Sequence, residues 1–353
     1  MSINPKNKNL KFDFIHNFNK FVTIDSKQPM TYIALPIEEP RPLPFYLAME
    51  EYVARNFPAC DHFFMWQVEP TVIFGRNQLI DSEVNTRYCK EHGISFYRRK
   101  SGGGCVYADR SNIMLSYITP DTNVNFTFNR YMLMVEHALQ GLGIDARTTG
   151  RNDILIDGKK VSGNAFYHLP GRSIVHGTML YDTDIDNMLQ ATTPSAAKLK
   201  SKGVESVRQH ITTLNRYTTL TIEEFKHHLR TTLCDSETVL TPADVCAIEK
   251  LSLDYLRPEF LYGCNPAYST IINHRIEGVG EFEVRLEIKE NRIRKASLSG
   301  DFFVTGDIDT AILSPLRGVE YNPSAVAQAL AACDAGATIH NLEKEQLIKL
   351  LFN

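Results

Sequence analysis

Short apolar segments along the first half of the chain predict β-strands. Four of them are rich in aromatic and β-branched residues and are bounded by turn-forming residues: 63–68, 71–75, 94–99 and 113–118. The first two lie on either side of Glu69 and Pro70. The segment 45–57, FYLAMEEYVARNF, instead has apolar residues at helical spacing and predicts an amphipathic helix.

Helices and strands continue to alternate in the middle of the chain. Helical spacing recurs over 128–143, which ends in glycine as many helices do. Asp157-Gly158 separates two short apolar runs within 153–163, which predicts a β-hairpin. A strand over 173–182 and a short helix over 184–190 follow. Because the elements interleave without a regular βαβ repeat, we expect an α+β fold with a mixed or antiparallel sheet.

A change of composition near 244–266 indicates a domain boundary. After it, apolar and polar residues alternate over 280–302 with a turn at Glu290-Asn291, and two helical patterns follow at 323–333 and 342–352. We therefore expect three parts. Residues 1–29 form a poorly ordered extension, 30–250 form the main domain, and 258–353 form a smaller α+β domain.

Composition narrows the class of protein. A formal net charge of −3 and a pI near 6.4 argue against binding nucleic acid through bulk positive charge. No apolar stretch reaches the roughly 18 residues that span a membrane. The seven cysteines are scattered and form no CxxC pair, which favours reduced thiols in a cytoplasmic protein over disulfides or a zinc site.

The stretch RRKSGGGCVYADRSN, residues 98–112, contains the first candidate chemistry. Glycines 102–104 allow backbone N–H groups to approach an anion, and Arg98, Arg99 and Lys100 add positive charge beside them. Arginine binds phosphate or carboxylate with two parallel hydrogen bonds. A GGG run alone is weak evidence, since a flexible connection between strands has the same composition.

The stretch GRNDILIDGKKVSGNAF, residues 150–166, contains a second candidate. Strand alternation predicts that Lys160 and Ser162 share one face of the hairpin and that Val161 lies on the other. If that face looks toward the glycines, Lys160 lies over an anion site. A surface lysine on an exposed hairpin is the alternative.

Together with HGTML and KLKSKGVESVRQHITTL, these motifs resemble the lipoate–protein ligases that have a catalytic domain followed by a small accessory domain. The resemblance covers residues 30 to about 353 and is strongest over 63–215. It implies a biotin/lipoate-ligase-like fold, related to the class II aminoacyl-tRNA synthetase core. It also implies a two-step reaction in which lipoate and MgATP form lipoyl-adenylate, and a protein lysine then displaces AMP.

The resemblance also implies roles for particular residues. Lys160 matches the catalytic lysine that contacts the α-phosphate and the acyl carbonyl oxygen. Asn152 and Asp153 match the phosphate and magnesium end, with Asp153 as the Mg²⁺ ligand. His176 matches the histidine beside the lipoyl chain. The remaining substrate- and nucleotide-binding candidates are Arg76, Arg99, Ser101, Gly102, Gly103, Gly104, Val106, Asn112, Ser162, Gly163 and Gly177.

The implied partners are lipoate or octanoate and apo lipoyl domains, either of 2-oxoacid dehydrogenase complexes or of the glycine cleavage H protein. Lysines 198, 200 and 202 with Arg208 are candidates for contact with an acidic acceptor domain. A solvated basic face is the alternative for these residues. We expect a monomer that binds neither nucleic acid nor membrane.

Two other functions stay open. An octanoyl transferase of the same fold needs a nucleophilic cysteine; one transferase class has it where this chain has Ser195, so Cys105 is the remaining candidate. A non-catalytic lipoyl-domain binding protein is the second, although the intact Arg99, Lys160 and Asp153 argue against it. The chain departs from better-known relatives at Ala108, often histidine, and at Tyr167, where some have arginine.

Overall fold

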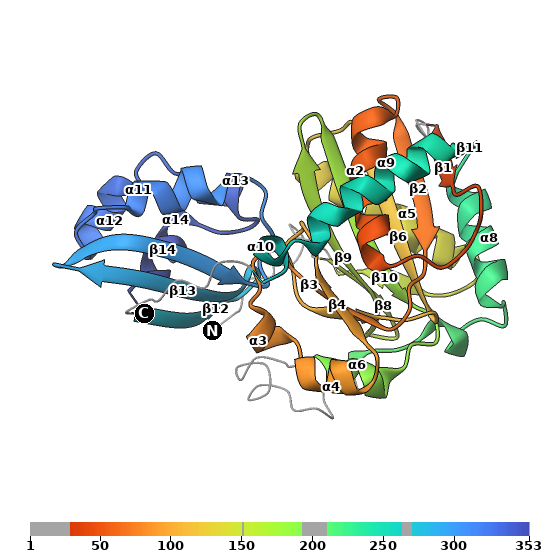
Figure 1. Ribbon diagram of the computed structural model, residues 1–353, viewed down its shortest axis with the longest axis horizontal. Helices are drawn as coiled ribbons and strands as arrows, with labels where there is room; N and C mark the ends of the chain where they lie inside the picture. The colour runs from red at the N-terminus through yellow and green to blue at the C-terminus, as the bar shows by residue number, and fades with distance from the viewer. Residues whose placement is uncertain (1–28, 150–151, 193–209, 263–269, 353) are drawn as a thin grey trace, which may run out of the picture.

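The computed structural model describes residues 29–149, 152–192, 210–262 and 270–352. The expected extension over 1–29 lies outside these residues except for Pro29. Within them the chain forms two units, each with its own hydrophobic core. The smaller unit is built from the blue C-terminal elements and lies beside the larger one in Figure 1.

An eight-stranded mixed sheet forms the centre of the larger unit, with the strand order β11-β1-β2-β6-β10-β9-β8-β7. Its strands β1, β2 and β11 pair in parallel, and the other pairs are antiparallel. The strands are β1 Met30–Ala34, β2 Asp61–Trp66, β6 Asn112–Thr119, β7 Ala146–Thr148, β8 Asp153–Ile156, β9 Lys159–Leu169, β10 Arg172–Leu180 and β11 Ser236–Val239. The predicted α+β class with a mixed sheet is confirmed.

A second sheet of three short strands, in the order β4-β3-β5, lies in the same unit. Its strands are β3 Thr71–Phe74, β4 Ser95–Arg98 and β5 Val106–Ala108. The neighbouring strands predicted on either side of Glu69-Pro70 therefore belong to different sheets. The glycine-rich segment 99–105 connects β4 to β5, the two edge strands of this small sheet.

Helices cover the larger sheet, and α2 and α9 run side by side in Figure 1. The helices of this unit are α2 Leu43–Asn56, α3 Ile80–Glu83, α4 Thr86–Glu91, α5 Val124–Gln140, α6 Ile185–Ala191, α8 Ile222–Leu233, α9 Pro242–Ser252 and α10 Pro258–Leu261, with 3₁₀ turns η3 Leu214–Arg216 and η4 Leu253–Leu256. Helix α8, which our sequence analysis missed, begins with a capping box between Thr221 and Glu224.

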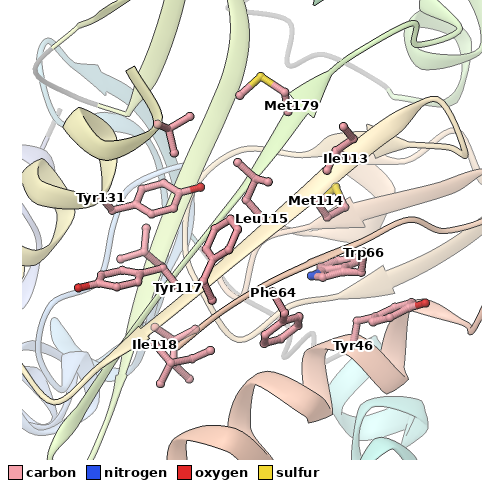
Figure 2. Packing of buried hydrophobic residues seen from close by; sticks show 14 of the residues in the cluster. Tyr46, Phe64, Trp66, Ile113, Met114, Leu115, Tyr117, Ile118, Tyr131 and Met179 are labelled. Atoms are coloured by element: carbon pink, nitrogen blue, oxygen red, sulfur yellow. The ribbon is translucent and has the colours of Figure 1, made fainter. Parts of the chain in front are cut away.

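Tight packing surrounds the central strand β6, all of whose residues are buried. Figure 2 shows Leu115, Tyr117 and Ile118 of this strand among the aromatic residues of the core. The rings of Trp66 and Tyr46 stack with centroids 4.9 Å apart, which joins β2 to α2. This stacking covers one face of the indole ring, whose hydrogen bond is described below.

The smaller unit has a three-stranded antiparallel sheet, β12-β13-β14, packed against short helices. Its strands are β12 Thr270–Ile276, β13 Gly280–Lys289 and β14 Arg292–Gly300, and its helices are η5 Asp309–Leu313, α11 Ser314–Leu316, α12 Pro323–Ala329, α13 Ala335–Thr338 and α14 Lys344–Leu350. The predicted turn at Glu290-Asn291 is confirmed, with φ of 53° and 57°. The exact division at residues 250 and 258 stays a prediction.

Phe303 of the smaller unit packs into the core of the larger one. It is 4% exposed, and its ring stacks on Phe166 of β9 at 5.7 Å between centroids. The backbone also joins the units, because the Gly103 N–H donates to the Phe302 carbonyl at 3.1 Å and the Gly300 N–H donates to the Asn77 carbonyl at 2.8 Å. The two units therefore meet at the glycine-rich segment.

We predict that Phe303→Ala lowers the free energy of unfolding by about 3 kcal/mol, because it removes a buried aromatic ring. The single tryptophan, Trp66, lies in the larger unit, so its fluorescence reports that unit. Leu347→Ala, in the core of the smaller unit, is the control. Phe303→Ala should lower the denaturation midpoint seen by Trp66 more than Leu347→Ala does. Equal shifts would contradict the described docking.

Candidate active site

A cavity of about 110 Å³ lies between the two sheets of the larger unit. Its wall combines apolar side chains with a few polar ones, as in sites that bind small organic molecules. The apolar part consists of Leu47, Trp66, Ile73, Val106, Met114 and Ala165. The remaining lining residues are Arg99, Gly103, Gly104, Cys105, Asn152, Lys160, Gly163, Asn164, His176, Gly177 and Thr178.

Lys160 is held in this cavity by Asp153 of the neighbouring strand, with Nζ 2.7 Å from the carboxylate Oδ1. Both side chains are partly exposed, at 36% and 29%. A Cβ on Gly163 would lie 2.7 Å from both Cε and Nζ of Lys160, so the lysine side chain occupies the space that any larger residue at 163 would fill. Gly163 thus makes room for the only lysine that lines the cavity in the described part of the chain.

The predicted orientation of Lys160 and Ser162 is wrong. The β8–β9 register shifts between Ile154 and Leu155, so Val161 is an extra residue in β9. After this bulge the Lys160 side chain lies over Gly163, whereas Ser162 hydrogen-bonds Asn164 two positions on. Simple alternation fails because one residue in the strand is not paired.

Arg99 is buried, at 5% exposure, beneath the glycine-rich segment. Its guanidinium donates four hydrogen bonds: to Ser101 Oγ at 2.9 Å, and to the carbonyls of Ile73, Gly102 and Gly104 at 3.0, 2.7 and 2.7 Å. Burial lowers its pKa to about 10, so it remains charged at neutral pH. Arg99 therefore determines the path of the segment while also contributing positive charge to the cavity.

Arg98 and Lys100, the other two cations predicted beside the glycines, contact groups outside the cavity. Arg98 donates to the carbonyls of Gly75, Arg76, Gln78 and Leu261. Lys100 pairs with Glu51 and lies over the Tyr255 ring at 4.8 Å. Neither lines the cavity. Of the three consecutive cations, only Arg99 does.

The glycine amides are less available than the sequence indicated. Gly103 N–H is bonded to the smaller unit, and a Cβ on Gly102 would lie 2.5 Å from the Phe302 carbonyl oxygen. Gly103 has φ of 86°, which also favours glycine. Phe302 and Phe303 of the smaller unit therefore lie in the space that these two glycines leave open.

His176 lies at the cavity wall between Ser101 and Glu50. Its Nε2 is 2.6 Å from Ser101 Oγ, and its Nδ1 is 3.0 and 2.9 Å from the two carboxylate oxygens of Glu50. Glu50 is fully buried in α2. Our sequence analysis missed this residue, although two adjacent glutamates on the apolar face of a predicted helix were a usable signal.

Several predicted site residues do not line the cavity. Ser101 and Asp153 contact residues that do. Asn112 and Ser162 are buried: the Asn112 amide donates to the Tyr107 carbonyl, and Ser162 accepts a hydrogen bond from the Asn164 amide. Arg76 is exposed. The Asp307 carboxyl in the smaller unit has a lowered pKa, chiefly because Thr310 donates hydrogen bonds to it. The positive charge of Arg76 in the larger unit lowers the same pKa further. The lining residues that sequence analysis missed are Leu47, Trp66, Ile73, Met114, Asn164, Ala165 and Thr178.

Some candidates lie outside the described residues: Ser195, lysines 198, 200 and 202, and Arg208. Cys105 lines the cavity and is half-buried. In the described ranges, no three His, Cys, Asp or Glu side chains converge to hold a metal ion. A lone carboxylate such as Asp153 fits Mg²⁺ only together with phosphate oxygens, which is the usual mode of Mg²⁺ binding beside nucleotides. None of the described helices has the length and apolar character needed to cross a bilayer.

Comparison with known families defines the class. A model of the lipoyl protein ligase A/B catalytic domain matches residues 42–234, and a model of the bacterial lipoate protein ligase C-terminus matches residues 265–351. This chain belongs to the lipoate–protein ligase family. It is 36% identical to lipoate–protein ligase 1 of Staphylococcus aureus over 314 residues, which cover 86% of this chain and 95% of that protein. It is 34% identical to lipoate-protein ligase LplJ of Bacillus subtilis, covering 90% and 98%.

Solved structures agree with this assignment. LipL1 of P. falciparum, determined with lipoate, has a TM-score of 0.73 over 91% of this chain and 97% of its own, at 18% identity, and so supports the fold alone. Lipoate-protein ligase A bound with ATP is 25% identical with a TM-score of 0.58, covering 66% and 99%. A bi-partite ligase of Thermoplasma acidophilum, described with its E2 lipoyl domain, is 25% identical with a TM-score of 0.60, covering 69% and 100%.

We predict that Arg99→Lys lowers the free energy of unfolding by about 2–4 kcal/mol. A lysine keeps the charge but cannot reach all four acceptors, and buried carbonyls are left without donors. Arg76→Lys, at an exposed position in the same region, should change stability by less than about 0.5 kcal/mol. Urea denaturation of both variants tests this. A stable Arg99→Lys protein would show that the carbonyl contacts are unimportant.

Proposed function

We propose that this protein activates lipoate with MgATP and transfers the lipoyl group to a lysine of an apo lipoyl domain. The observation that carries the proposal is Lys160, held over Gly163 in a cavity whose other walls are apolar side chains and the glycine-rich segment. An aliphatic acid fits the apolar wall, and its carboxylate needs a cation. The ligases similar to this chain support the same reaction.

The first step joins two anions, so the site must first reduce their repulsion. A lipoate carboxylate oxygen attacks the α-phosphorus of ATP, the P–O bond to the β-phosphate breaks, and pyrophosphate leaves with that electron pair. We infer that Lys160 donates hydrogen bonds to the oxygens where negative charge develops, and that Arg99 adds fixed positive charge. Asp153 keeps the lysine ammonium in place and offers one oxygen to Mg²⁺, which neutralises phosphate charge when bound.

In the second step the acceptor lysine amine attacks the acyl carbonyl carbon, and AMP leaves with the electrons of the C–O bond. The amine must first lose a proton, because a free lysine has a pKa near 10.4. We propose the same Lys160 as donor to the carbonyl oxygen. Acceptors are lipoyl domains of 2-oxoacid dehydrogenase complexes or the glycine cleavage H protein, and the T. acidophilum ligase with its lipoyl domain supports this class of partner.

The cellular location and the oligomeric state of the protein are also part of the proposal. We infer a cytoplasmic location from the seven cysteines of the sequence, which are scattered and form no CxxC pair. The monomeric state stays a prediction, and lipoate and octanoate are both candidate acyl substrates. The alternative transferase would use Cys105, which lines the cavity and therefore gives that reaction a specific test.

We predict that Lys160→Ala lowers the rate of lipoylation by about 10²- to 10³-fold, because it removes a donor aimed at developing charge. The assay is intact-mass analysis of an apo lipoyl domain incubated with the protein, MgATP and lipoate. Lys159→Ala, the exposed neighbour in the same hairpin, is the matched control and should stay close to the native rate. An ATP-free reaction should give no mass gain.

Two other outcomes of this assay would overturn the proposal. An octanoyl mass gain from acyl carrier protein without ATP, lost in Cys105→Ala, would identify a transferase. Tight binding of the lipoyl domain without any mass gain from either donor would identify a binding protein.

We predict that Gly163→Ala lowers the lipoylation rate by about 10²-fold while leaving the protein folded. The new methyl group displaces the end of the Lys160 side chain, and small misplacements of catalytic groups have effects of this size. Gly141→Ala at the end of α5 is the control, because it is in helical conformation and its Cβ would have no atom nearer than 3.4 Å. Native activity in Gly163→Ala would show that the reaction does not need the Lys160 side chain in this position.

A further inference from the structure

A continuous chain of hydrogen-bonded side chains runs beside the cavity from Trp66 to Arg99. Its members come from five separate parts of the sequence: Trp66, Ser116, Glu50, His176, Ser101 and Arg99. All six are nine-tenths buried or more. Three of them, Trp66, His176 and Arg99, line the cavity. Glu50 lies in the middle of the chain and outside the cavity wall.

The direction of the hydrogen bonds on one side of Glu50 follows from the donors. The Trp66 indole N–H has no acceptor ability and donates to Ser116 Oγ at 2.9 Å. Ser116 in turn donates its hydroxyl hydrogen to the Glu50 Oε1 at 2.6 Å. The carboxylate therefore holds the Trp66 ring through one serine, and the ring also stacks on Tyr46.

The direction on the other side follows from Ser101. The Arg99 Nε–H donates to Ser101 Oγ at 2.9 Å, so this serine already acts as an acceptor there. Within the described residues, the only other side-chain partner of its hydroxyl is His176 Nε2, at 2.6 Å. A buried hydroxyl hydrogen without an acceptor is unfavourable. Ser101 therefore donates to Nε2, which must carry no proton.

The tautomer of His176 is then determined. With Nε2 as an acceptor, the imidazole carries its proton on Nδ1, which lies 2.9 Å from Glu50 Oε2 and 3.0 Å from Oε1. The hydrogen bond made by one ring nitrogen sets the role of the other. Every donor in the chain thus points toward Glu50, the one group in it that only accepts.

We propose that Glu50 is a positioning residue of the ligase: its carboxylate fixes His176 as the Nδ1–H tautomer and holds Trp66 through Ser116. Both side chains are walls of the cavity in which the proposed reaction places the acyl group, so the inference rests on the proposed function. Glu50 acts through these neighbours and does not touch the substrate. Glu50 acts as a negatively charged carboxylate, because both of its oxygens accept hydrogen bonds.

Glu50→Gln separates this role from simple space-filling, because glutamine has the same shape but one oxygen replaced by NH₂. If the NH₂ group faces His176, the ring must present a lone pair at Nδ1 and carry its proton on Nε2. If it faces Ser116, that serine loses its acceptor and the Trp66 hydrogen bond is disturbed. Either the tautomer of His176 or the hydrogen bond between Trp66 and Ser116 must therefore change.

The first measurement is nitrogen NMR of the imidazole of His176, assigned by comparison with His176→Asn, and of the indole N–H of the single tryptophan. The native protein should show His176 protonated at Nδ1 and unprotonated at Nε2. Glu50→Gln should change either this pattern or the indole resonance. The matched control is Glu51→Gln, since Glu51 is equally buried but bonds Tyr255 and Lys100 instead. It should leave both signals unchanged.

The second measurement connects the chain to binding. Glu50→Gln should raise the KM for lipoate about tenfold, the size expected for one lost charge-assisted hydrogen bond, with a smaller change in the KM for ATP. Equal changes in both values would overturn the acyl-wall role. A native His176 protonated at Nε2, or a Glu50→Gln protein with both NMR signals unchanged, would overturn the positioning role. The NMR result requires no substrate, so it is independent of whether lipoylation occurs.

Discussion

The site depends on a guanidinium group that is buried without a bonded carboxylate in the described part of the chain. Burying a charge is unfavourable unless its donors are satisfied, and here backbone carbonyls of Ile73, Gly102 and Gly104 satisfy those of Arg99. The carbonyls must therefore point inward, and the glycine-rich segment can follow only one path. The same segment forms part of the cavity wall and contacts the smaller unit.

Much of the fold could be predicted because local chemistry and tertiary structure agree there. Asp157 and Gly158 both have positive φ, as a two-residue hairpin requires, and the apolar runs on either side fix the strands. The short strands β1, β5, β7 and β11 were missed, because three to five residues give too little periodicity. Helix α8 was missed even though Thr221 and Glu224 form a capping box that the sequence already contains.

The candidate site was predictable in composition but not in geometry. Lys160, Arg99 and His176 were expected near one another, and all three line one cavity. Composition does not say which acceptor each cation will find, so only the family resemblance distinguished Arg99 from Arg98 and Lys100. The bulge at Val161 likewise depends on strand pairing, which no local pattern reports. Glu50 was hidden because a buried carboxylate becomes plausible only when its donors are known.

The contact between the two units combines backbone hydrogen bonds at the glycine-rich segment with the buried ring of Phe303. Gly103 N–H meets the Phe302 carbonyl, and glycine at 102 and 103 leaves room for the approach of Phe302 and Phe303. The main-chain part of this joint does not depend on matching side-chain chemistry across it. The two units can therefore diverge in sequence at different rates, and chimaeras that exchange the smaller unit between relatives need to preserve little more than these glycines and the aromatic ring that covers them.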